Sequence, residues 1–468
     1  MGKQKKTEKI NSSISYSAVL QSMRKYHDSL DSRDLSWRKN QLRALNRLLV
    51  ENEASLQEAL YKDLRKGPIE SNITEIGFVK SEIELNLKNL KKWARPKKVT
   101  TPFVLKPGKS EIIAEPLGVA LIIGAWNYPI NLTLTPLVSC IAAGNAAILK
   151  PSELATHVSE LLAELIPRYL DKSAFKIVQG GVNETTALLE ERFDKIFFTG
   201  SQAVGAIVMK AAAKHTTPIT LELGGKSPCI VDSSADIELA ARRIVFGKYT
   251  NAGQTCVAPD YILAHEDIIE PLTKAFKRTI TSFYGDDPAK SEHFARIINK
   301  SHHQRLVQLI KGQQIEHGGA HDEADLYLEP TLLGRVKPGD PVMQEEIFGP
   351  VLPIISVKNA QEAFNFVSSR DKPLAFYTFA KDKGVINRAK SVQAGGVCIN
   401  DTIVHLGIQD LPFGGVGASG FGKYHGKYGF DDFSSIKSVF NGSTKVDLPV
   451  RYPPYGKIKR FILKHFTG

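Results

Sequence analysis

The chain has 468 residues, with 61 Lys and Arg against 49 Asp and Glu, and a formal net charge of +12. An apolar fraction of 42% and a charged fraction of 24% are ordinary for a globular protein, and the length fits about two to four domains or one large α/β unit. The four scattered cysteines exclude a secreted disulfide framework, so we expect a reducing, cytoplasmic compartment. No apolar run approaches the roughly 18 residues that a membrane-spanning helix needs.

The positive charge is concentrated near the two ends of the chain. Residues 1–10 carry four Lys and one Glu, and residues 451–468 carry five Lys and Arg with no acidic residue. These segments contribute +3 and +5, which together are +8 of the total +12. The remainder is only mildly basic and does not interleave basic with aromatic residues, so we expect no nucleic-acid partner.

The first part of the chain is predicted to be helical and the next part alternates strands with helices. Apolar residues at helical spacing indicate helices over 17–65 and 70–93. Four short apolar segments then follow, separated by helix-like stretches. The strands expected are 119–123, 146–150, 175–179 and 195–200. This alternation favours an α/β fold with a parallel, doubly wound sheet.

The same alternation resumes after residue 223, which favours a second α/β domain over one continuous sheet. Apolar segments there are 227–231, 261–264, 352–355 and 397–400. Residues 97–113, rich in Pro, Lys and Thr, interrupt the first domain and are a candidate protruding arm.

Cys256, in the segment NAGQTCVAP, is the first candidate for chemistry because small residues surround it. A reactive thiolate needs a polar, partly open setting, which this segment permits without requiring it. The other three cysteines lie in apolar surroundings and are interpreted as core residues. No Cys/His cluster suggests a bound metal.

Glu222, in LELGGKSP, lies beside a glycine turn. It is either a solvated turn residue or a carboxylate desolvated enough to act as a general base. GGKS does not complete a phosphate-binding loop, because Thr220 stands where that motif requires Gly.

Three more segments stand at expected strand ends. FFTGSQAVG has Gly200 and Gly205, a spacing that misses the dinucleotide fingerprint but still allows a helix N-terminus to hold a pyrophosphate. In ILKPSE, Lys150 and Glu153 either bind ribose hydroxyls or belong to a helix cap. In AWNYP, Asn127 is either an oxyanion donor or a turn former.

These segments occur in a fixed order together with two later ones, and the set resembles the NAD(P)-dependent aldehyde dehydrogenase superfamily over nearly the whole chain. The motifs are AWNYP, LKPSE, FTGSQAVG, LELGGKSP, GQTC, PVMQEEIFGP and LPFGGVG. The finer segments NYPINLTLTPL, GKSPCIVD and KYHGK are similar to the class 3 branch, which acts on fatty and aromatic aldehydes. The resemblance implies an aldehyde dehydrogenase-like fold, with two doubly wound α/β domains and a small β oligomerisation arm.

The resemblance also implies roles for three catalytic residues. Cys256 would attack the aldehyde to form a thiohemiacetal, and Asn127 with the Cys256 backbone amide would stabilise its oxyanion. After hydride transfer, Glu222 would activate the water that hydrolyses the thioester. A CoA-acylating dehydrogenase and a non-catalytic structural relative are the alternatives.

The coenzyme contacts implied by the family are Lys150, Glu153, Gly200, Ser201, Val204, Glu346 and Phe348. A carboxylate at Glu153 accepts ribose hydroxyls and repels a 2′-phosphate, which favours NAD, with NADP also accepted. Tyr128 either lines an apolar substrate entrance or is an ordinary core aromatic residue. The expected substrates are medium- to long-chain apolar aldehydes.

The resemblance further implies a homodimer. The expected division is a dinucleotide-binding domain (1–98 and 119–222), a catalytic domain (223–430), an oligomerisation arm (99–118 and 431–447) and a basic amphipathic tail (448–468). In the tail, Ile458, Phe461 and Ile462 fall near one helical face among basic residues. Such a helix either lies on an anionic membrane, making the enzyme membrane-peripheral, or docks on the protein itself.

Overall fold

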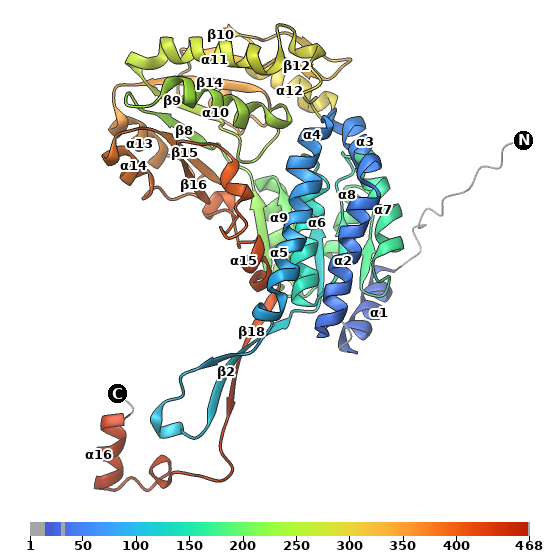
Figure 1. Ribbon diagram of the computed structural model, residues 1–468, viewed down its shortest axis with the longest axis vertical. Coiled ribbons are helices and arrows are strands. Elements are labelled where there is room, and N and C mark those ends of the chain that lie inside the picture. Colours follow the sequence, from blue (N-terminus) through green and yellow to red (C-terminus); the bar gives the residue numbers. More distant parts are fainter. Residues whose placement is uncertain (1–14, 30–32, 467–468) are drawn as a thin grey trace, which may run out of the picture.

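The computed structural model describes residues 15–29 and 33–466. Two α/β units lie side by side, and a long arm extends from one of them (Figure 1). The predicted fold class is therefore confirmed. The basic N-terminal segment 1–10 lies outside the described residues.

The N-terminal region is helical, as its apolar spacing predicts. Its helices are α1 (Tyr16–Asp28), α2 (Leu35–Glu51), α3 (Glu53–Leu64), α4 (Pro68–Ser71) and α5 (Gly77–Trp93). The stretch predicted over 17–65 is divided because local signals end each helix. Asp34 caps α2 by accepting from the Ser36 backbone N–H, and Arg65 ends α3 in a left-handed conformation with φ 55°. Between α4 and α5 lies a π-helical turn, η2 (Asn72–Ile76).

The first unit is built on a six-stranded sheet with the order β17-β7-β6-β3-β4-β5. Its strands are β3 (Val119–Ile123), β4 (Ala146–Lys150), β5 (Phe175–Ile177), β6 (Lys195–Gly200), β7 (Ile219–Leu223) and β17 (Gly420–Phe421). All neighbours are parallel except β17, which pairs antiparallel with β7. The four strands predicted before residue 201 are confirmed, with β5 shorter than expected.

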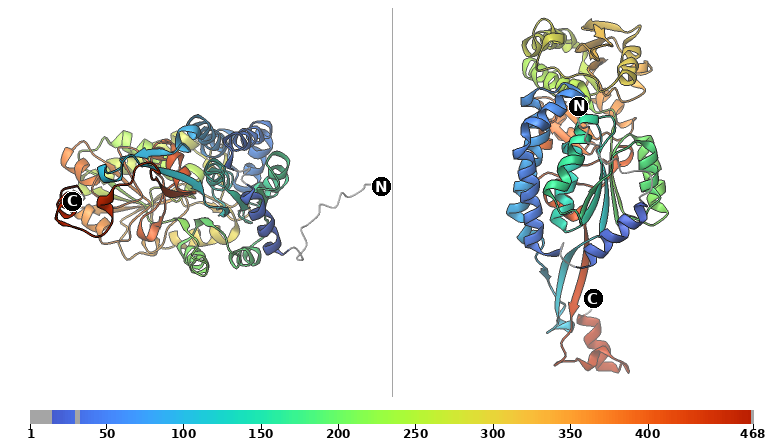
Figure 2. Two further views of the ribbon diagram at one scale, coloured as in Figure 1. Left: turned by 90° about the horizontal axis from the view of Figure 1, so that it is seen from below. Right: turned by 90° about the vertical axis from the view of Figure 1, so that its right-hand side faces the viewer.

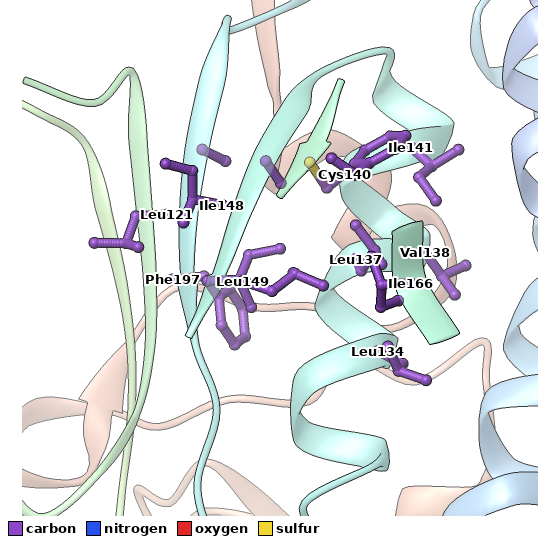
Figure 3. Packing of buried hydrophobic residues seen from close by; sticks show 14 of the residues in the cluster. Leu121, Leu134, Leu137, Val138, Cys140, Ile141, Ile148, Leu149, Ile166 and Phe197 are labelled. Carbon is purple, nitrogen blue, oxygen red and sulfur yellow. The ribbon is translucent and has the colours of Figure 1, made fainter. Parts of the chain in front are cut away.

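Helices between these strands cover the sheet and bury its apolar side chains. They are α6 (Asn131–Ala143), α7 (Thr156–Tyr169), α8 (Val182–Leu189) and α9 (Gln202–Ala213). Leu149 and Phe197 point from the sheet towards Leu137 on α6, whereas Leu121 points to the opposite face of the sheet (Figure 3). Cys140 is fully buried, which confirms its interpretation as a core residue. The sheet is apolar on both faces because its strands are covered on both.

The second unit is built on a seven-stranded sheet with the order β10-β13-β14-β9-β8-β15-β16. Its strands are β8 (Pro228–Val231), β9 (Tyr261–His265), β10 (Gln314–His317), β13 (Thr331–Gly334), β14 (Val351–Val357), β15 (Ala375–Phe379) and β16 (Gly396–Ile399). Its helices are α10 (Ile237–Tyr249), α11 (Ile269–Tyr284), α12 (Lys300–Ile310), α13 (Ala360–Ser368) and α14 (Lys383–Ala389). A two-stranded ribbon of β11 (His321–Asp322) and β12 (Tyr327–Leu328) lies beside it.

The chain returns to the first unit before residue 430. β17 adds to the six-stranded sheet, and Tyr424 and Phe430, the latter in α15 (Gly426–Asp432), belong to the hydrophobic core around that sheet. Residues 420–430, expected in the catalytic domain, therefore pack on the first unit, the one expected to bind the dinucleotide.

The arm is a three-stranded antiparallel sheet of β1 (Lys97–Val99), β2 (Lys109–Pro116) and β18 (Ser434–Asn441). It projects from the body and carries α16 (Lys457–Phe466) near its far end (Figure 2). Among residues 15–29 and 33–466, every helix is too short or too polar to cross a membrane.

Candidate active site

The candidate catalytic residues lie on loops and strand ends where the two units meet. Asn127 follows β3, Glu222 is the penultimate residue of β7, and Cys256 lies in the loop between α10 and β9. Glu346 lies in the loop that leads to β14. Side chains at the carboxyl ends of parallel strands converge at one edge, which explains why residues far apart in sequence meet here.

Cys256 is the single partly exposed residue in an otherwise buried stretch, Asn251–Asp260. Its sulfur accepts from its own backbone N–H and from that of Val257. Burial raises the pKa of the Cys256 thiol, and the carboxyls of Glu346 and Glu222 raise it further. Cys256 is therefore partly exposed as a residue, and the carboxyls of Glu346 and Glu222 both lie within electrostatic range of its thiol.

The turn before Cys256 has an unusual backbone. Asn251 and Ala252 have φ values of 54° and 50°, and Gly253 has a φ of 75°. A side chain on Gly253 would overlap the carbonyl of Gly349, so only glycine fits there. Strained turns of this kind persist where the surroundings hold them, as they do at many functional sites.

Asn127 is bound to the same turn. Its Nδ2 donates to the backbone oxygen of Gln254 at 3.0 Å, two residues before Cys256. An amide carries two N–H groups, so one can hold Gln254 while the other donates to an oxyanion at the thiol. Tyr128, the next residue, is half-buried, and its hydroxyl lies 2.5 Å from Oγ1 of Thr255. Tyr128 thus packs beside the thiol loop and is not a remote core residue.

Glu222 is a buried carboxyl. Within the described part of the chain, neither of its oxygens has a hydrogen-bond partner. Burial raises the pKa of Glu222 well above its ordinary value, while Lys423 acts in the opposite direction. Lys423 donates to the carbonyl of Gly415 at 3.1 Å, in the LPFGGVG segment, where a Cβ on Gly414 would overlap Oε1 of Glu222. A desolvated carboxyl with a raised pKa is suited to accept a proton from water.

Glu346 lies against the glycine pair of LELGGKSP. The Gly225 backbone N–H donates to its carboxyl, and a Cβ on Gly224 would overlap it. Burial and the neighbouring Asp260 raise the pKa of Glu346 to about 8. Gly224 therefore leaves the space that this carboxyl occupies, and Gly225 supplies a backbone N–H to it.

Phe348 stacks in an aromatic group that sequence reasoning missed. Phe348 has a φ of 50°, and its ring packs edge-on against the ring of Trp126, with 5.2 Å between the ring centroids. The ring of Trp126 also packs against that of His302 in α12, with 5.0 Å between the ring centroids. Trp126 lies in the AWNYP motif, but no spacing rule links that motif to a histidine on a helix of the other unit.

The remaining candidate coenzyme residues lie along the carboxyl edge of the six-stranded sheet. Lys150 is buried and its Nζ lies 3.3 Å from Oε2 of Glu153, whose side chain is 46% exposed. Ser201 caps α9 by accepting from the Val204 backbone N–H at 3.4 Å. Gly200 ends β6 directly before this cap, and Val204 is 42% exposed.

This edge fits a dinucleotide. The start of α9 offers backbone N–H groups to a pyrophosphate, and Thr199 before it has a buried hydroxyl without a partner among the described residues. Lys150 and the exposed carboxylate of Glu153 supply a donor and an acceptor for ribose hydroxyls. Among residues 15–29 and 33–466, no cluster of three His, Cys, Asp or Glu side chains is placed to hold a metal ion.

A thiol beside a buried carboxyl, next to a sheet edge that fits a dinucleotide, defines a dehydrogenase with covalent thiol chemistry. A model of the aldehyde dehydrogenase family matches residues 6–439. The chain belongs to the aldehyde dehydrogenase family and oxidises aldehydes with a nicotinamide dinucleotide.

Individual relatives agree with this assignment. A rat aldehyde dehydrogenase named dimeric and NADP-preferring is 48% identical over 446 residues, which is 94% of this chain and 98% of the relative. The mouse aldehyde dehydrogenase family 3 member A2 is 49% identical over 444 residues, covering 93% and 92%. The structure of the substrate-bound state of AldH from Staphylococcus aureus matches with a TM-score of 0.95 and 44% identity, covering 96% and 99%.

Proposed function

We propose that Cys256 is the nucleophile, Asn127 the oxyanion donor and Glu222 the general base of aldehyde oxidation. The observation that carries this assignment is the thiol of Cys256, a partly exposed residue, within electrostatic range of the buried Glu222 carboxyl, whose oxygens have no hydrogen-bond partner among the described residues. Replacing Cys256 with Ala should abolish turnover, and unchanged turnover would overturn the assignment.

The reaction follows from these positions. The Cys256 thiol releases its proton to solvent and its sulfur forms a bond to the aldehyde carbon, so that the carbonyl oxygen becomes an oxyanion held by Asn127 Nδ2 and the Cys256 backbone N–H. The bound coenzyme supplies the hydride acceptor. Loss of the hydride leaves a thioester on Cys256, and Glu222 takes a proton from the water that attacks it. The carboxylic acid leaves and the thiol is regenerated.

The presence of Glu222 favours hydrolysis of the thioester over transfer of the acyl group to coenzyme A. A buried carboxyl with a raised pKa is a base for water, whereas a transfer to a second thiol would not require it. Acyl-CoA formation when CoA is added would favour the alternative. Free carboxylic acid as the product in the presence of CoA supports hydrolysis.

The coenzyme is held at the edge of the six-stranded sheet. Lys150 and Glu153 bind the adenosine ribose, Gly200 and Ser201 face the pyrophosphate, and Val204 lies beside the adenine. Glu346 binds the nicotinamide ribose and Phe348 packs near the nicotinamide. The exposed carboxylate of Glu153 favours NAD, because a 2′-phosphate would be repelled. A clearly higher kcat/KM with NADP would overturn this preference, and the rat relative is itself named NADP-preferring.

The substrates are medium- to long-chain apolar aldehydes. The half-buried ring of Tyr128 beside the thiol loop supports this, since it offers apolar surface next to the reacting atom. The test is kcat/KM for a series from acetaldehyde to decanal. A rise with chain length supports the proposal, and a fall would end it.

The active form is a homodimer joined through the arm. Apolar side chains are exposed on the arm: Ile436 and Phe440 on β18 are 58% and 46% exposed, and Phe103 in the turn between β1 and β2 is 70% exposed. Exposed apolar surface of this kind is typical of interaction sites, and the rat relative is named dimeric. Light scattering should give twice the 51.6 kDa of the chain. A monomer would contradict the proposal.

The tail contacts an anionic membrane surface and makes a cytoplasmic enzyme membrane-peripheral. Ile458 and Phe461 of α16 are 78% and 63% exposed, and basic side chains surround them. Lys459 and Arg460 bond back to carbonyls of Tyr452 and Tyr455 in the preceding turn of the tail. Full-length protein should sediment with anionic liposomes and lose this on deletion of residues 450–468. No binding by the full-length protein would end the proposal.

A further inference from the structure

A buried ion pair from the N-terminal helical region lies directly behind the catalytic loops. Lys66 Nζ and Glu75 Oε1 are 2.6 Å apart, and both side chains are fully buried. Glu75 lies in the π-helical turn η2, a rare conformation found often at functional sites. Burying two charges is costly, and apolar residues of similar volume are often as stabilising. Stability alone therefore does not account for this pair.

Lys66 is bound to the backbone of Asn127. Its Nζ donates to the carbonyl oxygen of Asn127 at 2.9 Å, and Nδ2 of Asn251 donates to the same oxygen at 2.8 Å. The carboxamide of Asn127 is held separately by Gln254. The backbone carbonyl and the side-chain carboxamide of Asn127 are thus both fixed relative to the turn that precedes Cys256.

Glu75 holds the chain just after Asn127. Its Oε2 accepts from the backbone N–H groups of Ile130 at 3.1 Å and Asn131 at 2.9 Å, where α6 begins. The segment between these contacts carries Asn127 and Tyr128. The start of this segment is therefore bound to Lys66 and its end to Glu75, and Lys66 and Glu75 are bound to each other.

The same cluster reaches the thiol loop. The Lys66 ammonium lies 4.0 Å from the centre of the Tyr128 ring, and the Tyr128 hydroxyl lies 2.5 Å from Oγ1 of Thr255, next to Cys256. Glu70 accepts from the Asn251 backbone N–H at 2.8 Å. The cluster therefore ties the oxyanion donor and the nucleophile loop to one another.

We infer that Lys66 and Glu75 are positioning residues, which hold the Asn127 carboxamide where the oxyanion forms. The inference rests on the proposed role of Asn127. It assigns a part in catalysis to two side chains that do not touch the substrate. Because a displacement of about 1 Å can slow an enzymatic step about 10²-fold, loss of the pair should be seen chiefly in the step that forms the oxyanion.

The test compares Lys66→Met, Glu75→Gln and the double variant with the wild-type enzyme. We expect Lys66→Met to lower the single-turnover rate of reduced-coenzyme formation about 10²-fold. The KM for the coenzyme should stay unchanged, because the dinucleotide lies elsewhere. Alkylation of Cys256 by iodoacetamide should also keep its rate, since that reaction forms no oxyanion. Equal losses in alkylation and hydride formation would show general damage to the loop and overturn the inference.

The double variant separates positioning from stability. Each single variant leaves one charge of the Lys66–Glu75 pair without its partner, whereas the double variant removes both, so its melting temperature should recover toward that of the wild type. The rate of hydride formation should stay low, because the Asn127 carbonyl still lacks the Lys66 donor. Recovery of the rate together with stability would overturn the inference.

Two controls complete the design. Arg24→Met removes the partly exposed Arg24–Asp194 ion pair, 2.6 Å long and outside the site, and should lower stability without changing turnover. Asn127→Ala tests the role on which the inference rests. Normal hydride formation in Asn127→Ala would refute the proposed oxyanion role and the inference together. A slow Asn127→Ala with a normal Lys66→Met would refute the positioning role alone.

Discussion

Gly224 and Glu346 lie so close that a Cβ on the glycine would overlap Oε2 of the carboxyl. The two residues are 122 positions apart in the sequence, and Gly224 lies in the connection between β7 and β8. Gly224→Ala should displace the Glu346 carboxyl, which we propose binds the nicotinamide ribose. We expect the KM for the coenzyme to rise about tenfold, the effect of losing roughly 1.4 kcal/mol of hydrogen bonding. Steady-state kinetics with varied coenzyme would measure it.

Gly225→Ala is the matched control for this substitution. The nearest atom to a Cβ at Gly225 is the Leu374 backbone nitrogen at 3.7 Å, an ordinary van der Waals distance. Alanine also keeps the backbone N–H that donates to Glu346. We expect an unchanged KM for the coenzyme. Equal effects of the two alanines would show that Glu346 is not the cause.

Glu153→Gln should shift coenzyme preference toward NADP. The substitution keeps the shape of the side chain and removes the charge that repels a 2′-phosphate. We expect the ratio of kcat/KM for NAD to that for NADP to fall about tenfold, comparable to one charge-assisted hydrogen bond. Glu160→Gln, an exposed position on α7 with the same change of charge, should leave the ratio unaltered.

The burial of Glu222 predicts a pH-dependent stability. In the folded protein the pKa of Glu222 lies well above 4.5, its ordinary value, which we take for the unfolded chain. At any pH between the unfolded-state pKa and the folded-state pKa, the folded protein retains a proton that the unfolded chain has released. The folded state then binds more protons, and its stability falls as pH rises through this window. Thermal unfolding should show Glu222→Gln gaining stability over the wild type as pH rises above 4.5. A difference between the two proteins that does not change with pH would contradict the raised pKa.

Much of the fold could be predicted because each early strand is a compact apolar segment. The strands β3, β4 and β6 match the expected ranges since their residues are buried on both faces and need no long-range information. β17 has two residues, Gly420 and Phe421, and carries no periodicity. Its pairing with β7 depends on the chain returning across the second unit.

The candidate site divides in the same way. Cys256, Glu222 and Asn127 stand in motifs whose small neighbours and strand-end positions mark them. Lys66 and Glu75 carry no such mark, because a Lys and a Glu in a charged helical region usually face solvent. Their burial depends on Asn127, 61 residues beyond Lys66, and no local spacing encodes that contact.

The most direct test of the proposed mechanism is the fate of the thioester in Glu222→Gln. Without the base, hydride transfer can proceed while hydrolysis is slow. Mixing enzyme, coenzyme and aldehyde should give a burst of about one reduced coenzyme per subunit, followed by a slow phase. Peptide mass spectrometry should find the acyl group on Cys256 and leave Cys140, Cys229 and Cys398 unmodified. An acyl group on another residue, or full turnover without a covalent adduct, would contradict the mechanism.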